Sequence, residues 1–101
     1  MGLLHYGEAR FAFDDRSLAH LQIVVSTKLR RAERFFLSWN QSSESGDERI
    51  AVWIDNGVQI YFQYSSTDQP SINRRWIEEM LDQANSSAGV HLTQECDSEE
   101  S

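Results

Sequence analysis

Residues 14–40 constrain the fold most strongly, because there an amphipathic helix leads almost directly into an aromatic strand. Asp14 or Asp15 is a suitable N-cap, since a short acidic side chain can accept hydrogen bonds from the first backbone N–H groups of a helix. Apolar residues then recur at helical spacing. They are Leu18, Leu21, Val25, Leu29 and Ala32, with Val24 at the edge of the stripe. The helix is expected to end between Arg30 and Glu33, and this connection is a fold signal that carries no chemistry.

The middle of the chain predicts strands. Residues 35–40 alternate between core-type and outward-facing positions, which is the period of a strand. Residues 41–48 are polar and rich in Ser and Gly, so we expect a mobile loop there. Residues 50–54 and 58–64 predict a hairpin. A three-residue loop, residues 55–57, is favoured over a two-residue loop because it gathers the apolar rows of both strands on one face.

The ends of the chain complete the pattern. Residues 3–6 and 10–13 predict an opening hairpin. Asn73 is a plausible N-cap for a second helix that ends between residues 85 and 89, and a short strand is expected to follow. The buried stripe of this helix is expected to contain Trp76, Ile77, Met80, Leu81 and Ala84. The order β-β-α-β-β-β-α-β predicts an α+β fold, in which an antiparallel sheet has two helices packed on one face.

Length and charge define the domain organisation. A chain of 101 residues is one domain by size, and we expect residues 1–93 to form a single α+β domain. Residues 94–101 contain four acidic residues and no basic one, which leaves −3 of the net charge of −7 on the rest of the chain. These residues predict a disordered acidic tail.

Cysteine content and hydropathy restrict the class of protein. Cys96 is the single cysteine, so neither an internal disulfide nor a cysteine zinc site can form. The first residues lack the basic leader and the apolar run of a signal peptide, and no apolar stretch is long enough to cross a membrane. We therefore expect a cytoplasmic protein that does not associate with membranes.

Four segments carry a resemblance to a known family. They are FDDRSLAHLQ, KLRRAERFFLSW, PSINRRWIEEMLDQANSS and GVHLT, and together they span nearly the whole chain before the acidic tail. The sequence resembles a family of small actinobacterial proteins of unknown function, whose members often carry the label "ATP-dependent DNA ligase" in genome annotation. The resemblance implies this label but not the activity. A ligase of that type needs a Lys-x-Asp-Gly motif, whereas Lys28, the only lysine, is followed by Leu-Arg-Arg.

No constellation of residues predicts catalysis. His5, His20 and His91 do not share metal-ligand spacing, so ordinary edge or surface histidines are the better interpretation. The adjacent Asp14 and Asp15 are explained by helix capping. The sequence lacks a nucleophile elbow, a glycine-rich phosphate loop and a His-Glu-x-x-His helix. We therefore expect no enzymatic activity, no metal and no cofactor.

One basic cluster has two interpretations. Lys28, Arg30, Arg31 and Arg34 follow one another near the end of the first helix. They could bind phosphate, or they could complement the negative end of the helix dipole while their long side chains cover the edge of the core. The acidic balance of the chain argues against nucleic acid as a partner, because such binding draws its affinity from neutralised phosphates.

Three aromatic residues form the candidate interaction surface. Phe36, Trp53 and Tyr61 point away from the apolar rows, and the expected hairpin would place Tyr61 opposite Ala51 and diagonal to Trp53. Large rings on a polar face indicate that the face is covered, either by the chain itself or by a protein partner such as a second copy. Alternatively, the rings could stack single-stranded bases.

These observations favour a small cytoplasmic, non-catalytic interaction module or homodimer. The alternative is a nucleic-acid-associated accessory protein that carries a ligase label without ligase chemistry. Retention on single-stranded DNA separates the two hypotheses.

Overall fold

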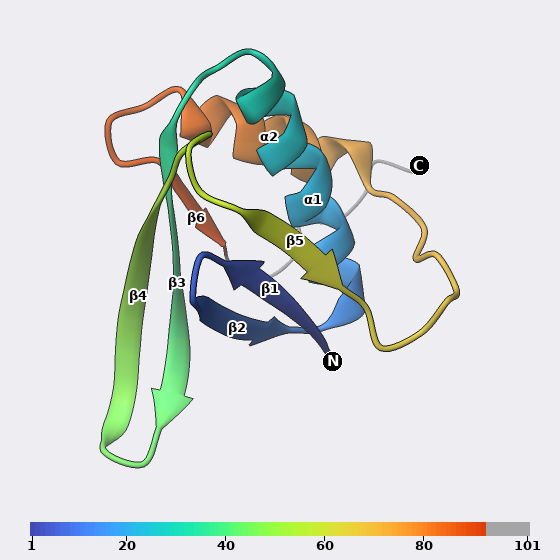
Figure 1. Ribbon diagram of the computed structural model, residues 1–101, viewed down its shortest axis with the longest axis vertical. Coiled ribbons are helices and arrows are strands. Elements are labelled where there is room, and N and C mark those ends of the chain that lie inside the picture. The colour runs from blue at the N-terminus through green and yellow to red at the C-terminus, as the bar shows by residue number, and fades with distance from the viewer. Residues whose placement is uncertain (93–101) are drawn as a thin grey trace.

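The computed structural model describes residues 1–92 and has an α+β architecture (Figure 1). The predicted tail, residues 94–101 with Cys96, lies outside the described residues. In chain order the elements are β1 Gly2–Tyr6, β2 Ala9–Phe13, α1 Asp15–Arg30, β3 Phe35–Ser43, β4 Gly46–Ile54, β5 Ile60–Gln63, α2 Arg74–Ala84 and β6 Val90–Leu92. Both the fold class and the order of the elements are therefore confirmed.

The strands form two three-stranded sheets where we expected one. The first has the order β2-β1-β5 and the second β4-β3-β6. All pairs are antiparallel except β3 with β6, which is parallel. Figure 1 shows α1 and α2 packed together on one side of the molecule, while the β3–β4 hairpin projects from the other side.

The first helix forms as the sequence indicates. The Asp14 carboxylate accepts a hydrogen bond from the Ser17 N–H at 3.0 Å, which confirms the N-cap. The predicted stripe buries Leu18, Leu21, Val24 and Val25. Ala32 departs from the prediction, because its φ of 58° takes it out of the helix and it lies exposed in the turn to β3.

The predicted hairpin between β4 and β5 is wrong. β4 pairs with β3 instead, and β5 pairs with β1. The segment expected to be a loop, residues 41–48, extends both β3 and β4 around a turn at residues 44 and 45. Its polar side chains pair across the strands, with Gln41 Nε2 donating to Glu48 Oε2 at 2.9 Å and Ser42 Oγ donating to Asp47 Oδ1 at 3.3 Å.

A buried histidine joins the two helices. His20 is fully buried, which corrects its interpretation as an edge or surface residue. Its Nδ1 lies 2.7 Å from the Arg16 carbonyl oxygen, and its Nε2 accepts a hydrogen bond from the Asn73 N–H at 2.8 Å. The Asn73 side chain in turn caps α2 by accepting from the N–H groups of Arg75 and Trp76. The start of α2 is thereby fixed to the middle of α1.

Gly89 brings the end of α2 against β3. Its φ is +78°, and a Cβ atom at this position would lie 2.3 Å from the Phe36 carbonyl oxygen. This close approach allows β6 to pair with β3 directly after the turn, with Val90 beside Leu37. Glycine is therefore required here by both the backbone conformation and the available space.

We predict that Gly89→Ala lowers the free energy of unfolding by about 1–3 kcal/mol or more. A left-handed backbone and a clash with the backbone of β3 both oppose the added methyl group. Gly57→Ala is the matched control, since its Cβ would meet nothing within 4 Å. Thermal unfolding of the two variants checks the prediction. Equal melting temperatures would contradict this role of Gly89.

Candidate interaction surface

The outer face of the β3–β4 hairpin carries an exposed aromatic pair. We define this face by Phe36, Ser38, Arg49, Ala51 and Trp53, whose side chains point away from the core. Phe36 lies directly opposite Trp53 in the strand register, and their rings meet edge to face with centroids 4.8 Å apart. Phe36 is 40% exposed and Trp53 is 47% exposed. Two large rings are thus held in place and remain open to solvent.

Strand alternation explains how the pair is supported. Phe35, Leu37 and Trp39 point from β3 into the core and are almost fully buried. Phe36 lies between two of these anchors, so its direction is fixed by the pleat of the strand. Exposure of Phe36 and Trp53 was predictable from this period of two.

A hydroxyl group connects the two sheets at the aromatic end of the outer face. The Tyr6 hydroxyl donates to the Trp53 carbonyl oxygen at 2.7 Å and accepts a hydrogen bond from the Asp55 N–H at 2.9 Å. Tyr6 belongs to β1, whereas Trp53 belongs to β4. The backbone that carries the Trp53 ring is therefore tied to the neighbouring sheet.

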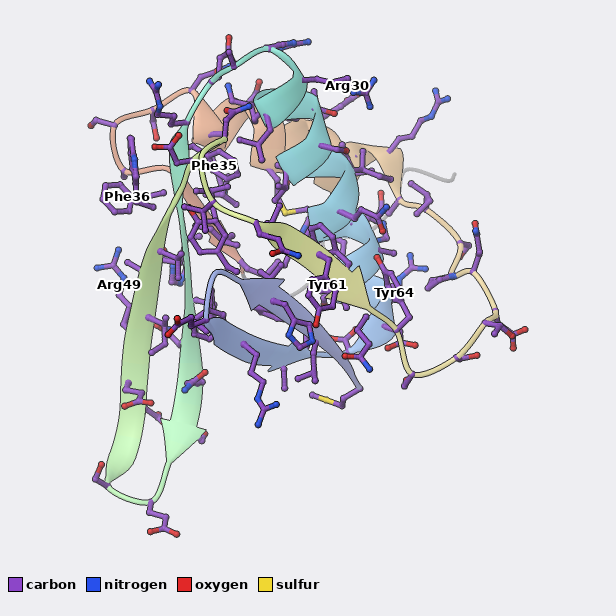
Figure 2. The ribbon with its side chains drawn as sticks, viewed as in Figure 1. Arg30, Phe35, Phe36, Arg49, Tyr61 and Tyr64 are labelled. Atoms are coloured by element: carbon purple, nitrogen blue, oxygen red, sulfur yellow. The ribbon has the colours of Figure 1, made fainter. Side chains whose placement is uncertain are left out.

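Tyr61 does not join the aromatic pair. It lies on β5, opposite His5 of β1 rather than opposite Ala51. It is 50% exposed and stacks on the His5 ring with a centroid separation of 4.1 Å. Figure 2 shows Phe36 beside the projecting hairpin and Tyr61 over the other sheet. The structure thus brings together two of the three predicted surface residues.

Ser38 and His91 form the polar centre of the outer face. The Ser38 Oγ lies 2.9 Å from the His91 Nδ1, and the backbone N–H of His91 donates to Gln83 Oε1 at 3.2 Å. The pair links β3 to β6. Only 2% of Ser38 is exposed, so the hydroxyl group is not accessible as a nucleophile.

The predicted basic cluster is divided by the fold. Lys28 is 3% exposed, and its Nζ lies 2.8 Å from Asn85 Oδ1 and 2.6 Å from Glu33 Oε1. Arg34 pairs with Asp55 at 3.1 Å. Arg30 and Arg31 are exposed. Two of the four cations are thus engaged in ion pairs within the domain.

These ion pairs shift the pKa values of the two carboxyl groups. The hydrogen bond from Lys28 holds the pKa of Glu33 below its usual value of 4.5. The hydrogen bond from Arg34 likewise lowers the pKa of Asp55 below 3.8. In both cases the folded state favours the ionised carboxylate.

Two cavities in the described part of the domain differ in position, and the larger borders the outer face at His91. The larger, of about 640 Å³, has Asp14, Arg16, Trp76 and His91 among its lining residues. The smaller, of about 510 Å³, lies between α1 and the chain after β5. Within residues 1–92, no group of three His, Cys, Asp or Glu side chains is arranged to hold a metal ion.

Sequence reasoning overlooked Arg49. This exposed residue follows Ala51 along the outer face of β4, and Figure 2 shows it on the side of the hairpin away from β1 and β2. Counting back from Trp53 in steps of two would have placed it on this face. The expectation of a loop over residues 41–48 concealed how far the strand extends.

We predict that Glu33→Gln weakens the loss of stability at low pH. A carboxylate with a lowered folded-state pKa stabilises the protein above its unfolded pKa, and this contribution is lost as the pH falls through the folded value. The wild type should therefore lose melting temperature as the pH falls below the usual glutamate value of 4.5, and Glu33→Gln should lose less. Glu44→Gln, in the exposed hairpin turn, is the control. An unchanged pH slope in Glu33→Gln would refute this role of the ion pair.

Comparison with known proteins identifies a family. A domain of unknown function, DUF7882, matches residues 1–95, so the chain belongs to this family. No curated protein and no solved structure matches the chain. In residues 1–92, neither helix has the length and apolar character needed to span a membrane.

Proposed function

We propose that this DUF7882 domain is a non-catalytic interaction module that binds a protein partner through the outer face of the β3–β4 hairpin. The observation that carries the proposal is the exposed Phe36–Trp53 pair, with ring centroids 4.8 Å apart. Tryptophan and phenylalanine are enriched at protein interfaces, where rigid rings bury much area at a low cost in conformational entropy. The core side chains of β3 and the Tyr6 contact hold the pair in a fixed position.

The charges beside the rings favour protein over nucleic acid. Base stacking proteins combine aromatic rings with a basic groove that follows the phosphates. Here Lys28 is buried and Arg34 pairs with Asp55, so these two cations do not flank the rings as a phosphate track. Arg49 lies on the same face as the pair and suits a mixed protein interface, in which arginine is also enriched. Salt-dependent retention on single-stranded DNA would favour the nucleic-acid alternative instead.

The surroundings of Lys28 support a protein without ligase chemistry. A nucleotidyl-transfer lysine must reach a phosphate, whereas the Lys28 Nζ is buried between Glu33 and Asn85. We therefore propose that Lys28 forms no adenylate. The ligase label implied by the resemblance then has no basis in adenylate chemistry.

We predict that the protein forms no covalent adenylate when incubated with labelled ATP and magnesium. A denaturing gel is the measurement. A labelled band that disappears in both Lys28→Ala and Lys28→Arg, with folding verified by circular dichroism, would contradict the absence of ligase activity.

We predict that Trp53→Ala weakens partner binding at a modest cost in stability, about 1–2 kcal/mol, because the ring is half exposed. Trp39→Ala is the contrasting variant and should cost about 3–5 kcal/mol, because that ring is buried in the core. Thermal and chemical unfolding separate the two. A cost for Trp53→Ala that equals that of Trp39→Ala would assign the ring to the core and overturn the proposal.

Binding itself can be measured by photo-cross-linking in cells. A benzoylphenylalanine at position 36 should give protein adducts, and Trp53→Ala should reduce them. The same probe at Tyr61, an equally exposed ring on the other sheet, is the matched control. Adducts that are absent at position 36, or equal at the two positions, would contradict an interface at the outer face.

A further inference from the structure

β4 exposes one backbone edge. In the sheet order β4-β3-β6 it is the outermost of the described strands, it has nine residues, and its sequence contains no proline. Its register with β3 is continuous from Ile54 to Gly46, so no bulge bends the strand away from a neighbour. A long, regular edge of this kind is a template for pairing with another strand.

The register shows which backbone groups face the open edge. The hairpin has a two-residue turn, so Ser43 and Gly46 form a hydrogen-bonded pair and the even-numbered residues of β4 bond to β3. The odd-numbered residues then direct their N–H and C=O groups outward. The Tyr6 contact agrees with this assignment, because it engages the Trp53 carbonyl oxygen and the Asp55 N–H. Tyr6 occupies the edge beyond Trp53, where it engages the Trp53 carbonyl oxygen and the Asp55 N–H. A carbonyl oxygen can accept a second hydrogen bond, and Tyr6 does not engage the Trp53 N–H or the backbone groups of Arg49 and Ala51.

We infer that β4 pairs with β4 of a second copy of this chain, antiparallel and with the two-fold axis at Ala51. In this register Ala51 lies opposite its own symmetry mate. Arg49 lies opposite Trp53 of the other copy, and Ile50 lies opposite Val52. The small Ala51 side chains allow a close approach at the axis.

Complementarity on both faces of the joined sheet supports a second copy as the occupant. On the outer face, the guanidinium of Arg49 can pack against the exposed Trp53 ring across the interface, which is a favourable cation–π arrangement. On the inner face, the half-buried Ile50 and Val52 meet apolar partners. One strand sequence thus supplies both members of each pair, as a two-fold interface requires.

The register with its two-fold axis at Ile50 is less favourable. An axis at Ile50 would also align the outward-facing backbone groups, because it pairs odd-numbered residues with one another. It would place Asp47 opposite Trp53 and Glu48 opposite Val52, so that each acid faces an apolar side chain. Removal of a carboxylate from water against an apolar side chain opposes this arrangement. The Ala51 register avoids both contacts.

The inference rests on the proposed function, because it names a second copy as the partner that packs against Trp53 of the outer face. Sedimentation velocity of the purified full chain tests it. The wild type should form a concentration-dependent dimer, and Ala51→Pro should weaken dimerisation at least about tenfold, because it removes an outward N–H from the intermolecular ladder. Asp47→Pro is the matched control. Its N–H also points outward but lies outside the Arg49–Trp53 ladder, so dimerisation should persist.

Cross-linking tests the register. In a Cys96→Ser background, Ala51→Cys should form an intermolecular disulfide on mild oxidation, because opposed residues in a hydrogen-bonded pair lie about 5.5 Å apart at Cα. Asp47→Cys should not, since it does not meet itself in this register. Equal cross-linking of the two cysteine variants would overturn the Ala51 axis.

Failure of this inference can be distinguished from failure of the proposed function. A wild type that stays monomeric at concentrations on the order of 1 mM would overturn self-pairing. In that case, adducts at position 36 with another protein would still support the outer face as an interface. A dimer that is weakened by Trp53→Ala but not by Ala51→Pro would also overturn pairing through the β4 edge.

Discussion

The antiparallel pairing of β3 with β4 is the constraint on which the functional reading depends. It places Phe36 opposite Trp53, and the alternation of the two strands directs both rings outward while Leu37 and Trp39 enter the core. It also makes β4 the edge of its sheet. The sequence predicted a hairpin in which β4 pairs with β5. In that arrangement Tyr61 would have joined Phe36 and Trp53 on one face. The same residues would then have formed a different surface.

The helices and their caps could be predicted because their signals are local. Asp14 and Asn73 each accept hydrogen bonds from N–H groups within the next three residues. Both partners of each cap are therefore visible in a short stretch of sequence. Strand pairing is different. Pairing β4 with β5 or with β3 buries the same apolar residues, so burial could not decide between the two. Residues in polar cross-strand pairs such as Gln41–Glu48 are also typical of loops. The sequence therefore predicted a loop where the two strands of the hairpin continue.

The candidate site was predictable to a similar extent. Period-two alternation was sufficient to predict that Phe36 and Trp53 are exposed. The sheet to which a strand belongs depends on non-local pairing, so the sequence placed Tyr61 on the wrong sheet. The basic cluster shows the same limit. Lys28 looks like a surface cation in the sequence, yet its partners include Asn85, which is distant along the chain and close only after α2 packs on α1. The edge of β4 could not be recognised until the partner of each strand was known.

Residue-resolved amide hydrogen exchange of the full chain tests the central claim most directly, because a partner strand on the β4 edge would both contact Trp53 of the outer face and protect the outward N–H groups. The Ala51 N–H points outward in a single copy, whereas the N–H groups of Ile50 and Val52 bond to β3 and serve as internal references. The account predicts that Ala51 exchanges rapidly in dilute solution and becomes protected as the protein concentration rises, while the two references stay protected throughout. Rapid exchange at Ala51 at every concentration, with the references protected, would contradict strand pairing between two copies.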